Sequence, residues 1–328
     1  MRKPLLAVAA AVALAAPATA ATAPAAPGPQ GLDTRFGNCG VITPPLPRNF
    51  SGAQRLARAP GGAIVAAGTA TLRLKGSVIH PDTFVVTRFS ADGVLDTGFG
   101  GGDGVVTLKV PRPSGAGDAQ LTGLAVDAGG KVVVSGYVQL ADPSRSRSLL
   151  ARYNPDGTLD SSFGSGGIAD DALPAANSGE IDDIALAPGG GLFAAGGRDP
   201  GGFTVARYRP DGTLDPAFGS GGVATLDPGI GGSHAFVVRV LADGRVLAGG
   251  QAGAQYELVR LLPTGMADPS FGNGGVTVES PPAAGAISAL APLGDGRVLA
   301  AGTASNINGR DQLALARYGA DGHADTGF

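Results

Sequence analysis

The sequence has one cysteine, Cys39, no tryptophan and three histidines, and aromatic residues make up 5% of its 328 residues. A lone cysteine excludes an intrachain disulfide and a cysteine-rich zinc site. With so few aromatic side chains, small aliphatic residues must supply most of the core. The chain therefore needs a large buried surface to be stable without cross-links.

The chain also lacks an excess of charge. Lysine and arginine number 24 against 27 acidic residues, which gives a net charge of −3. Such a balance offers no basic footprint for nucleic acid and no polybasic patch for a membrane surface. We expect neither nucleic acid nor membrane as a partner of the mature chain.

The N-terminus is typical of a secretory signal peptide. Arg2 and Lys3 precede an apolar run from Leu5 to Ala16, and Ala18-Thr19-Ala20 has the small-x-small pattern of a cleavage site. The run is too short to span a bilayer comfortably. We expect residues 1–20 to be removed, residues 21–30 to be a flexible leader, and the product to be secreted, periplasmic or held at the cell surface.

Glycine and proline are abundant, at 56 and 25 residues, and the glycines follow a repeat. The motif Asp-x-x-Phe occurs six times, and successive phenylalanines lie 63, 64, 55, 53 and 57 residues apart. The six motifs are Asp33/Phe36, Asp96/Phe99, Asp160/Phe163, Asp215/Phe218, Asp268/Phe271 and Asp325/Phe328. A period of this length indicates a repeat architecture.

Each unit contains four short strand patterns, which we name A to D. In the second unit they are Gln120–Asp127, Lys131–Val138, Ser148–Tyr153 and Gly167–Ala169. Four short strands per unit without helical periodicity favour an all-β fold, a β-propeller of five four-stranded blades. A solenoid and an incomplete propeller remain alternatives. The predicted domain covers residues 31–328, with repeats at about 45–99, 100–163, 164–218, 219–271 and 272–328.

Residues 33–43 resemble a lone strand D, whereas the last unit ends after strands A to C. The simplest hypothesis is that residues 33–43 complete the last blade and hide its exposed edge. The motif at Asp33–Phe36 duplicates the one at Asp325–Phe328, and only one of them can fill that position. An open ring or a missing further unit would explain the duplication instead.

The stretch Leu150–Gly164, with its Asn154-Pro155-Asp156-Gly157 turn and Asp160-x-x-Phe163 motif, resembles the signature of delta-sixty repeat proteins, and Ala206–Gly219 matches nearly as well. These are uncharacterised exported bacterial proteins assigned to a propeller-like domain. The fourth unit departs, with Leu261 for the aromatic residue and Thr264 for the turn aspartate. The resemblance implies a fold, and it implies no catalytic residues.

Few residues favour catalysis or a cofactor. The oxygen-rich turn beginning at Asn154 suggests calcium, but its spacing is wrong for an EF-hand and its first position is Leu262 in the fourth unit. His80, His234 and His323 lie in no recognisable catalytic motif, and the glycine-rich turns lack the lysine of a phosphate loop. We therefore assign no catalytic residue, metal or cofactor.

Two constellations stand out. Strand C carries an arginine in every unit, and we expect each to pair with an Asp-x-x-Phe carboxylate. These residues are Arg88, Arg152, Arg207, Arg260 and Arg317, with Asp96, Asp160, Asp215, Asp268 and Asp325. Separately, Asp170, Asp171, Glu180, Asp182 and Asp183 cluster in the third unit. A solvated acidic rim is the simpler interpretation, and paired carboxylates of a glycan hydrolase are the alternative.

Strand direction alternates within a blade, so the A–B and C–D turns share one face and the B–C and D–A connections share the other. The first set is short and repetitive, and the second varies, as binding loops on a rigid scaffold do. Candidate binding residues there are Arg73, His80, Arg145, Arg147, Arg198, Asn306 and Arg310. The sequence favours a non-catalytic binding scaffold of unknown ligand, with cell-surface carbohydrate or protein as possible partners.

Overall fold

The computed structural model describes residues 32–43, 50–70, 82–111, 116–142, 144–170, 172–173, 178–199, 202–280, 285–305 and 310–328. The expected signal peptide and leader lie outside these residues. Within the described part of the chain, no helix has the length and apolar character that a membrane crossing needs.

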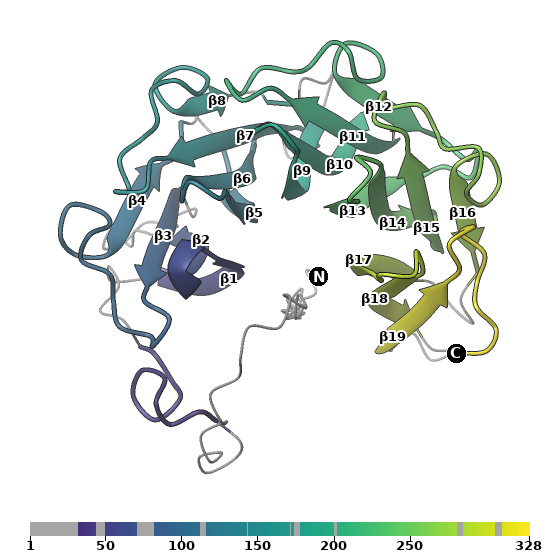
Figure 1. Cartoon of the computed structure of the whole chain (residues 1–328). Helices are drawn as coiled ribbons and strands as arrows, with labels where there is room; N and C mark the ends of the chain where they lie inside the picture. Colours follow the sequence, from purple (N-terminus) through teal and green to yellow (C-terminus); the bar gives the residue numbers. More distant parts are fainter. Residues whose placement is uncertain are drawn as a thin grey trace.

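Five antiparallel sheets follow one another along the chain and are arranged around a common centre (Figure 1). We call each sheet a blade and keep the names A to D for its strands in chain order. The first blade contains β1 (Phe50–Arg58), β2 (Ile64–Ala70), β3 (Thr83–Phe89) and β4 (Val105–Lys109), with the 3-10 turn η2 (Pro60–Gly62) between β1 and β2. The second contains β5 (Ala119–Val126), β6 (Val132–Gln139), β7 (Ser146–Tyr153) and β8 (Ile168–Asp170). The third contains β9 (Ser178–Leu186), β10 (Leu192–Asp199), β11 (Gly202–Tyr208) and β12 (Val223–Leu226). The fourth contains β13 (His234–Val240), β14 (Val246–Ala252), β15 (Gln255–Leu261) and β16 (Val276–Glu279). The fifth contains β17 (Gly285–Pro292), β18 (Val298–Ser305) and β19 (Asp311–Tyr318).

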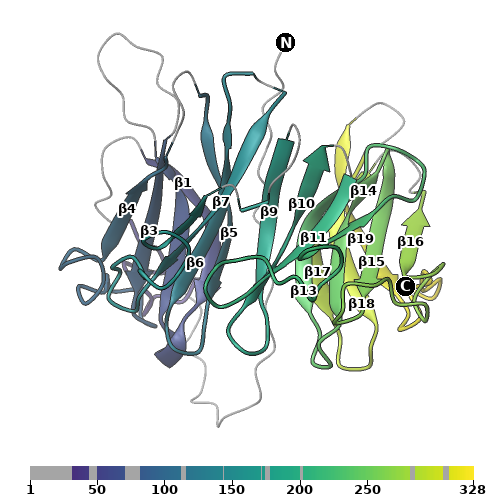
Figure 2. The ribbon, with the colours of Figure 1, turned by 90° about the horizontal axis from the view of Figure 1, so that it is seen from above.

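The strands predicted for the second unit lie within two residues of the observed ones. The predicted repeats end at the phenylalanine of each Asp-x-x-Phe motif, whereas each sheet continues beyond it. Strand D follows the motif in the chain but pairs with strand C of the same blade, as β8 pairs with β7. Strand A is innermost in each blade, and the turns lie at the two ends of the strands (Figures 1 and 2).

The hydrophobic core lies between blades. Each of the four core clusters combines one blade's side chains with those of the next: Val86 packs with Leu149, Leu150 with Ile184, Val205 with Val238, and Leu258 with Leu290. Since each blade is only one sheet thick, its two faces are buried by its two neighbours. Stability therefore depends on the contacts between successive blades.

The five blades form an open arc in Figure 1, with the first and last blades apart. Leu56 of β1 and Leu313 of β19 are 69% and 76% exposed, whereas Tyr256, which holds the position of Leu313 in the fourth blade, is buried. Leu56 and Leu313 are more exposed than Tyr256 because no described sheet covers the outer face of the first blade or of the last blade.

Residues 33–43 do not complete the last blade in this structure, contrary to the closure hypothesis. The last sheet has three strands, and the N–H of Gly37 donates to the carbonyl of Asp92 in the first blade at 2.8 Å. An equivalent hydrogen bond joins the N–H of Gly164, after strand C of the second blade, to the carbonyl of Asp211 in the C–D turn of the third blade, at 2.7 Å. The N-terminal motif thus docks on the first blade as every other Phe-Gly turn docks on the blade that follows it.

Each strand C arginine contacts the Asp-x-x-Phe carboxylate of its own blade, eight residues later. The Nε–Oδ2 distance is 2.7 Å for Arg88, Arg152, Arg260 and Arg317 and 3.3 Å for Arg207. The pairs of the second and fourth blades are buried, and the other three are partly exposed. In four blades the guanidinium also lies over the motif phenylalanine, 4.4–4.8 Å from the ring centre; Arg207 lies over Phe193 instead.

The same guanidiniums join neighbouring blades. Nη1 of Arg152 donates to the carbonyl of Pro210, and Nη1 of Arg260 donates to the carbonyl of Ala320 at 2.7 Å. Arg88 and Arg207 reach the equivalent carbonyls of the blades that follow them, Pro155 and Pro263. Each of these four arginines therefore fixes its own motif and the C–D turn of the next blade, whereas Arg317 of the last blade fixes its own motif alone. We call this arrangement the arginine staple.

Prediction: Arg152→Ala should lower the free energy of unfolding by about 3 kcal/mol, because it leaves a buried carboxylate with a single cation and removes the bond to the next blade. Chemical denaturation measures this. The matched control is Arg209→Ala, since Arg209 is half-exposed and lies 3.7 Å from Asp215; its effect should stay below about 1 kcal/mol. Equal effects of the two substitutions would contradict the staple.

Candidate functional site

Strand A contains a β-bulge at the same place in every blade. The register of A against B shifts around one extra residue, and these residues are Gln54, Thr122, Asp182, Phe236 and Ser288. A bulge turns a side chain out of the regular alternation and is common beside binding and active sites. Because strand A is innermost in each blade, the five bulges lie on the strands nearest the centre of the arc (Figure 1).

A glycine of strand B faces each bulge. Gly196 pairs with Ile181, and a Cβ on Gly196 would lie 1.8 Å from the carbonyl oxygen of Glu180. The same approach distance is 1.9–2.2 Å at Gly136, Gly250 and Gly302. The bulge thus requires glycine on strand B, while its own residue is free to vary.

Polar and aromatic side chains from three consecutive blades gather around the third bulge. We call Gln120, Tyr137, Glu180, Asp182 and His234 the inner cluster. His234 Nε2 lies 2.6 Å from Asp182 Oδ2, and the Tyr137 hydroxyl donates to Gln120 Oε1 at 2.7 Å. Gln120, Glu180 and His234 hold equivalent positions just before the bulges of β5, β9 and β13.

Aromatic and basic groups border the inner cluster. The ring of Phe236 stacks on that of His234 with centres 4.7 Å apart. Arg55 of the first blade donates to the carbonyl of Asp182 in the third blade at 3.4 Å. A Cβ on Gly197 would lie 2.4 Å from His234 Nδ1, so only glycine leaves room for the imidazole there.

The environment separates the protonation behaviour of these groups. Burial raises the pKa of Glu180, and the charge of Asp182 raises it further. Burial lowers the pKa of His234, but the hydrogen bond and charge of Asp182 together with the charge of Glu180 outweigh it, and the net shift is upward. Burial and the nearby charges of Glu180 and Asp182 raise the pKa of Tyr137. The inner cluster therefore holds a protonatable carboxyl, an imidazole that favours its charged form, and a neutral phenol.

The inner cluster lies on the face formed by the B–C and D–A connections. Gln120, Glu180 and His234 are among the first three residues of their strands, immediately after the D–A connections. This is the face that the sequence predicted for binding, although the inner cluster was not among the predicted residues. His234 had been found in no recognisable catalytic motif, and the acidic residues of the third unit were expected to form a solvated rim.

That expectation about the rim is wrong for the residues at its centre. Asp182 is engaged by His234, and Asp183 accepts from the backbone N–H of Val238 at 3.1 Å and from Arg239 Nη1 at 2.8 Å. Asp183 therefore ties the third blade to the fourth. Two consecutive carboxylates have different surroundings because the bulge turns Asp182 away from Asp183.

The structure describes three of the seven predicted binding side chains. Arg145 lies in the B–C turn of the second blade, and Arg147 begins β7 with its Nε 3.3 Å from Asp170 Oδ1. Arg310 precedes β19 on the fifth blade and is exposed. Arg73, His80 and Asn306 lie outside the described residues, as does the side chain of Arg198. The described three are thus divided between two blades.

The sequence did contain a signal for the inner cluster. Once the units are aligned on the glycine of the A–B turn, a second glycine recurs six residues later in every strand B: Gly68, Gly136, Gly196, Gly250 and Gly302. A glycine inside a strand often marks a bulge or a close backbone approach.

Among the described residues, no group of three or more His, Cys, Asp and Glu side chains could hold a metal ion.

Four stretches of the chain match a family model described as a domain of unknown function (DUF5122) beta-propeller: residues 130–163, 190–218, 241–271 and 293–328. Each stretch runs from an A–B turn to the phenylalanine of the Asp-x-x-Phe motif. The chain is a β-propeller repeat protein. The all-β propeller prediction is thereby confirmed at the level of fold, while the delta-sixty name stays a prediction.

Solved structures with a similar arrangement have low identity to this repeat protein, and none of the curated proteins matches it. A protein of unknown function from Dyadobacter fermentans is 14% identical over 80% of this chain and 76% of its own, with a TM-score of 0.45. A GH43 endo-arabinanase from Bacillus licheniformis is 14% identical over 82% and 94%, with a TM-score of 0.41. CoXyl43, a GH43 β-xylosidase/α-arabinofuranosidase from a compost microbial metagenome, is 11% identical over 87% and 96%, with a TM-score of 0.43. Likenesses of this size carry no argument about activity.

A further carboxyl of this protein is fully buried. Glu257 of β15 is 0% exposed, and neither carboxylate oxygen has a hydrogen-bond partner among the residues that the structure describes. Burial raises its pKa to about 7, although the nearby Ser233 hydroxyl opposes the shift. Leu149 holds the equivalent position in the second blade, so the repeat accommodates an aliphatic side chain there.

Prediction: the stability of the protein should fall as pH rises from about 4.5 through 7, because the unfolded chain releases the Glu257 proton before the folded chain does. Glu257→Leu should remove this slope and add up to about 3 kcal/mol at pH 8. Thermal unfolding of both proteins between pH 4 and pH 8 measures the effect. Parallel curves over that range would show that Glu257 does not carry the pH dependence.

Proposed function

We propose that the protein is an exported, non-catalytic binding scaffold whose ligand binds at the inner cluster, on the face of the B–C and D–A connections. The observation that carries this proposal is the convergence of Gln120, Glu180 and His234 from three blades at the same level. Convergent polar groups beside an aromatic surface are typical of ligand sites. The N-terminal pattern of Arg2, Lys3 and the apolar run supports export.

The chemistry of the inner cluster favours a ligand rich in hydroxyl groups, such as a cell-surface carbohydrate. Carboxylate and amide oxygens accept hydrogen bonds from hydroxyls, and the phenol and imidazole can donate to them. The stacked His234 and Phe236 rings add an apolar surface. Arg145, Arg147 and Arg310 belong to the same face and would extend the contact to its rim.

A glycan hydrolase is the second candidate, because one specific observation favours it. Glu180 and Asp182 lie in one cluster, and burial raises the pKa of Glu180. A carboxyl that holds its proton to higher pH can act as the acid beside a second carboxyl. Their position on a single strand, two residues apart, favours binding over attack from opposite sides of a glycosidic bond.

Prediction: on a glycan and polysaccharide array, the protein should bind without releasing product. Glu180→Gln and His234→Ala should each weaken binding about tenfold or more, because each removes a hydrogen bond from a charged group. Ser288→Ala is the matched control, since Ser288 holds the same bulge in the fifth blade and is exposed; its binding should be unchanged. Melting temperatures verify that all variants are folded.

Other outcomes decide against the proposal. Product release that stops in Glu180→Gln and Asp182→Asn would establish the hydrolase instead. Binding that survives the inner-cluster substitutions and the triple change of Arg145, Arg147 and Arg310 to Ala, but is lost on altering the A–B turns, would place the ligand on the other face.

A further inference from the structure

Glu257 is a buried carboxyl that the proposed function does not use. It lies on the face of β15 that also carries Val259 and Leu261, which pack against the third blade. No cation balances its charge within the part of the chain that the structure describes. The neighbouring strands β11 and β13 carry three basic side chains, but each of these pairs with another carboxylate. The pairs are Arg207 with Asp215, His234 with Asp182, and Arg239 with Asp183.

The other charged groups near Glu257 are acids. Strand β14 carries no charged residue, and β16 carries only Glu279. Asp227, in the connection between β12 and β13, has a like charge that raises the pKa of Glu257 beyond the effect of burial. Ionised Glu257 would therefore be a buried charge without compensation, which is costly.

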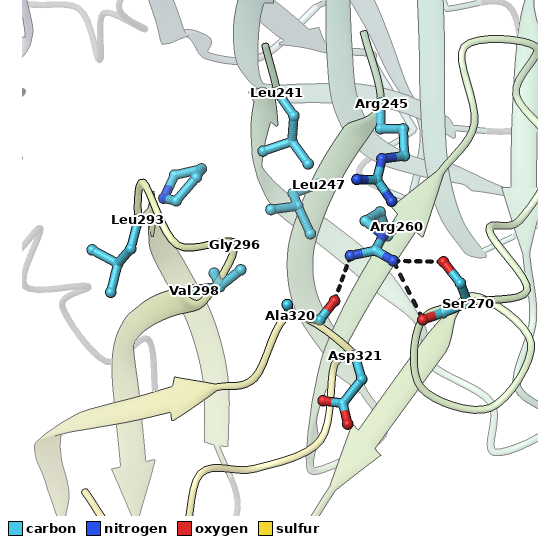
Figure 3. Close-up of a pocket in the computed structure, with 11 residues that line it drawn as sticks. Leu241, Arg245, Leu247, Arg260, Ser270, Leu293, Gly296, Val298, Ala320 and Asp321 are labelled. Atoms are coloured by element: carbon cyan, nitrogen blue, oxygen red, sulfur yellow. Dashed lines mark hydrogen bonds between the residues drawn. The ribbon is translucent and has the colours of Figure 1, made fainter. Parts of the chain in front are cut away.

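The other end of the fourth blade shows a buried carboxylate that is compensated. Arg260 Nε and Arg245 Nη1 lie 2.7 and 3.0 Å from Oδ2 of Asp268. Figure 3 shows both guanidiniums beside a cavity of about 400 Å³, with Arg260 bonded to Ser270. Burial raises the pKa of Asp268, but hydrogen bonds from Ser270 and the two arginines lower it far more. Asp268 thus stays ionised at a pH where Glu257 holds its proton.

A glycine-rich connection ends beside Glu257. It joins β12 to β13, and we call residues 227–233 the glycine loop. All three of its glycines are exposed and have positive φ angles, and small residues are common at hinges. Ser233, at its end, is buried against the third blade, since a Cβ on Gly202 would lie 3.3 Å from the Ser233 Cβ. Its hydroxyl lies close enough to Glu257 to oppose the rise of that pKa.

The glycine loop leads directly into the inner cluster. Ser233 precedes His234, whose Nε2 lies 2.6 Å from Asp182 Oδ2 and whose ring stacks on Phe236. A displacement of Ser233 is therefore passed to the imidazole through one peptide bond. The loop is also an exposed segment beside Glu257, so its movement would let water reach the carboxyl.

We propose that Glu257 is a pH-sensitive latch on the inner cluster. The protonated carboxyl donates a hydrogen bond to the Ser233 hydroxyl and holds the glycine loop in place. When the carboxyl loses its proton to water, the loop opens, water reaches the carboxylate, and His234 moves away from Asp182. The effect on ligand binding rests on the proposed function, whereas the opening of the loop does not.

Hydrogen exchange of backbone amides tests the latch. The protection of residues 233–237, corrected for the intrinsic pH dependence of exchange, should fall about 70-fold between pH 5 and pH 8, as follows from a carboxyl pKa of 4.5 in the open loop and about 7 in the closed one. Amides of β6 in the second blade should stay protected, because the opening is local.

Three variants identify the group responsible. Glu257→Gln and Glu257→Leu cannot ionise, so the protection of residues 233–237 should no longer depend on pH. Leucine holds the equivalent position in the second blade, as Leu149, which makes Glu257→Leu compatible with the fold. Glu279→Gln is the matched control, because it removes a carboxyl from the adjacent strand, and it should behave as the unaltered protein does.

Three results would overturn the latch: protection that does not fall with pH, the same fall in Glu257→Gln, or an equal loss in every blade. Glycan binding then tests the link to the inner cluster. It should weaken more between pH 5 and pH 8 in the unaltered protein than in Glu257→Gln, and equal pH profiles would overturn that link. An absence of glycan binding at every pH would count against the proposed function alone, since exchange decides the latch without a ligand.

Discussion

The arginine staple is the interaction on which the rest of the structure depends. A blade is a single sheet and cannot bury its own faces, so the protein is stable only where consecutive blades are held in register. One guanidinium performs three tasks at once: it pairs with the aspartate of its own Phe-Gly turn, covers an aromatic ring, and donates to the carbonyl of the following turn. Arginine suits this role because its donors are planar, fixed in direction and permanently charged. A lysine has no planar group to lie over the ring, and its donors are not fixed in direction.

The staple lies in the outer part of each blade and leaves positions of strand A open to variation. Strand A packs through its alternate aliphatic residues and through polar contacts such as that of Asp183. The bulge adds one residue outside the regular alternation, and the glycine opposite it keeps the backbone path the same. Asp182, Phe236 and Ser288 therefore occupy equivalent places with very different chemistry. The inner cluster joins one such bulge residue, Asp182, with three residues that precede the bulges.

The sequence predicted the strands, the blade order and the Arg–Asp partners well, because each depends on a local pattern that recurs. Apolar and polar residues alternate around Leu150 and Arg152, which identifies strand C in one unit. A short apolar run alone could be a strand or part of a helix, and its recurrence in every unit decides for a strand. The inner cluster could not be found in the same way. His234 and Asp182 are 52 residues apart and meet only because adjacent blades bring their first strands together, and the bulge that turns Asp182 reverses the alternation on which a prediction from one strand depends. The position of residues 33–43 was missed for a related reason, because a motif that fits two places does not reveal which neighbour it binds.

The staple also has a direction, since the arginines of the first four blades reach forward to the blade that comes later in the chain. During synthesis the N-terminal blades emerge first. Arg152 can then pair with Asp160 at once, but the carbonyl of Pro210 does not exist until a further blade has been made. Each interface is therefore completed one blade behind the growing end, and until then the forward face of the newest blade stays uncovered. Assembly of this protein is thus ordered in time from its first blade to its last.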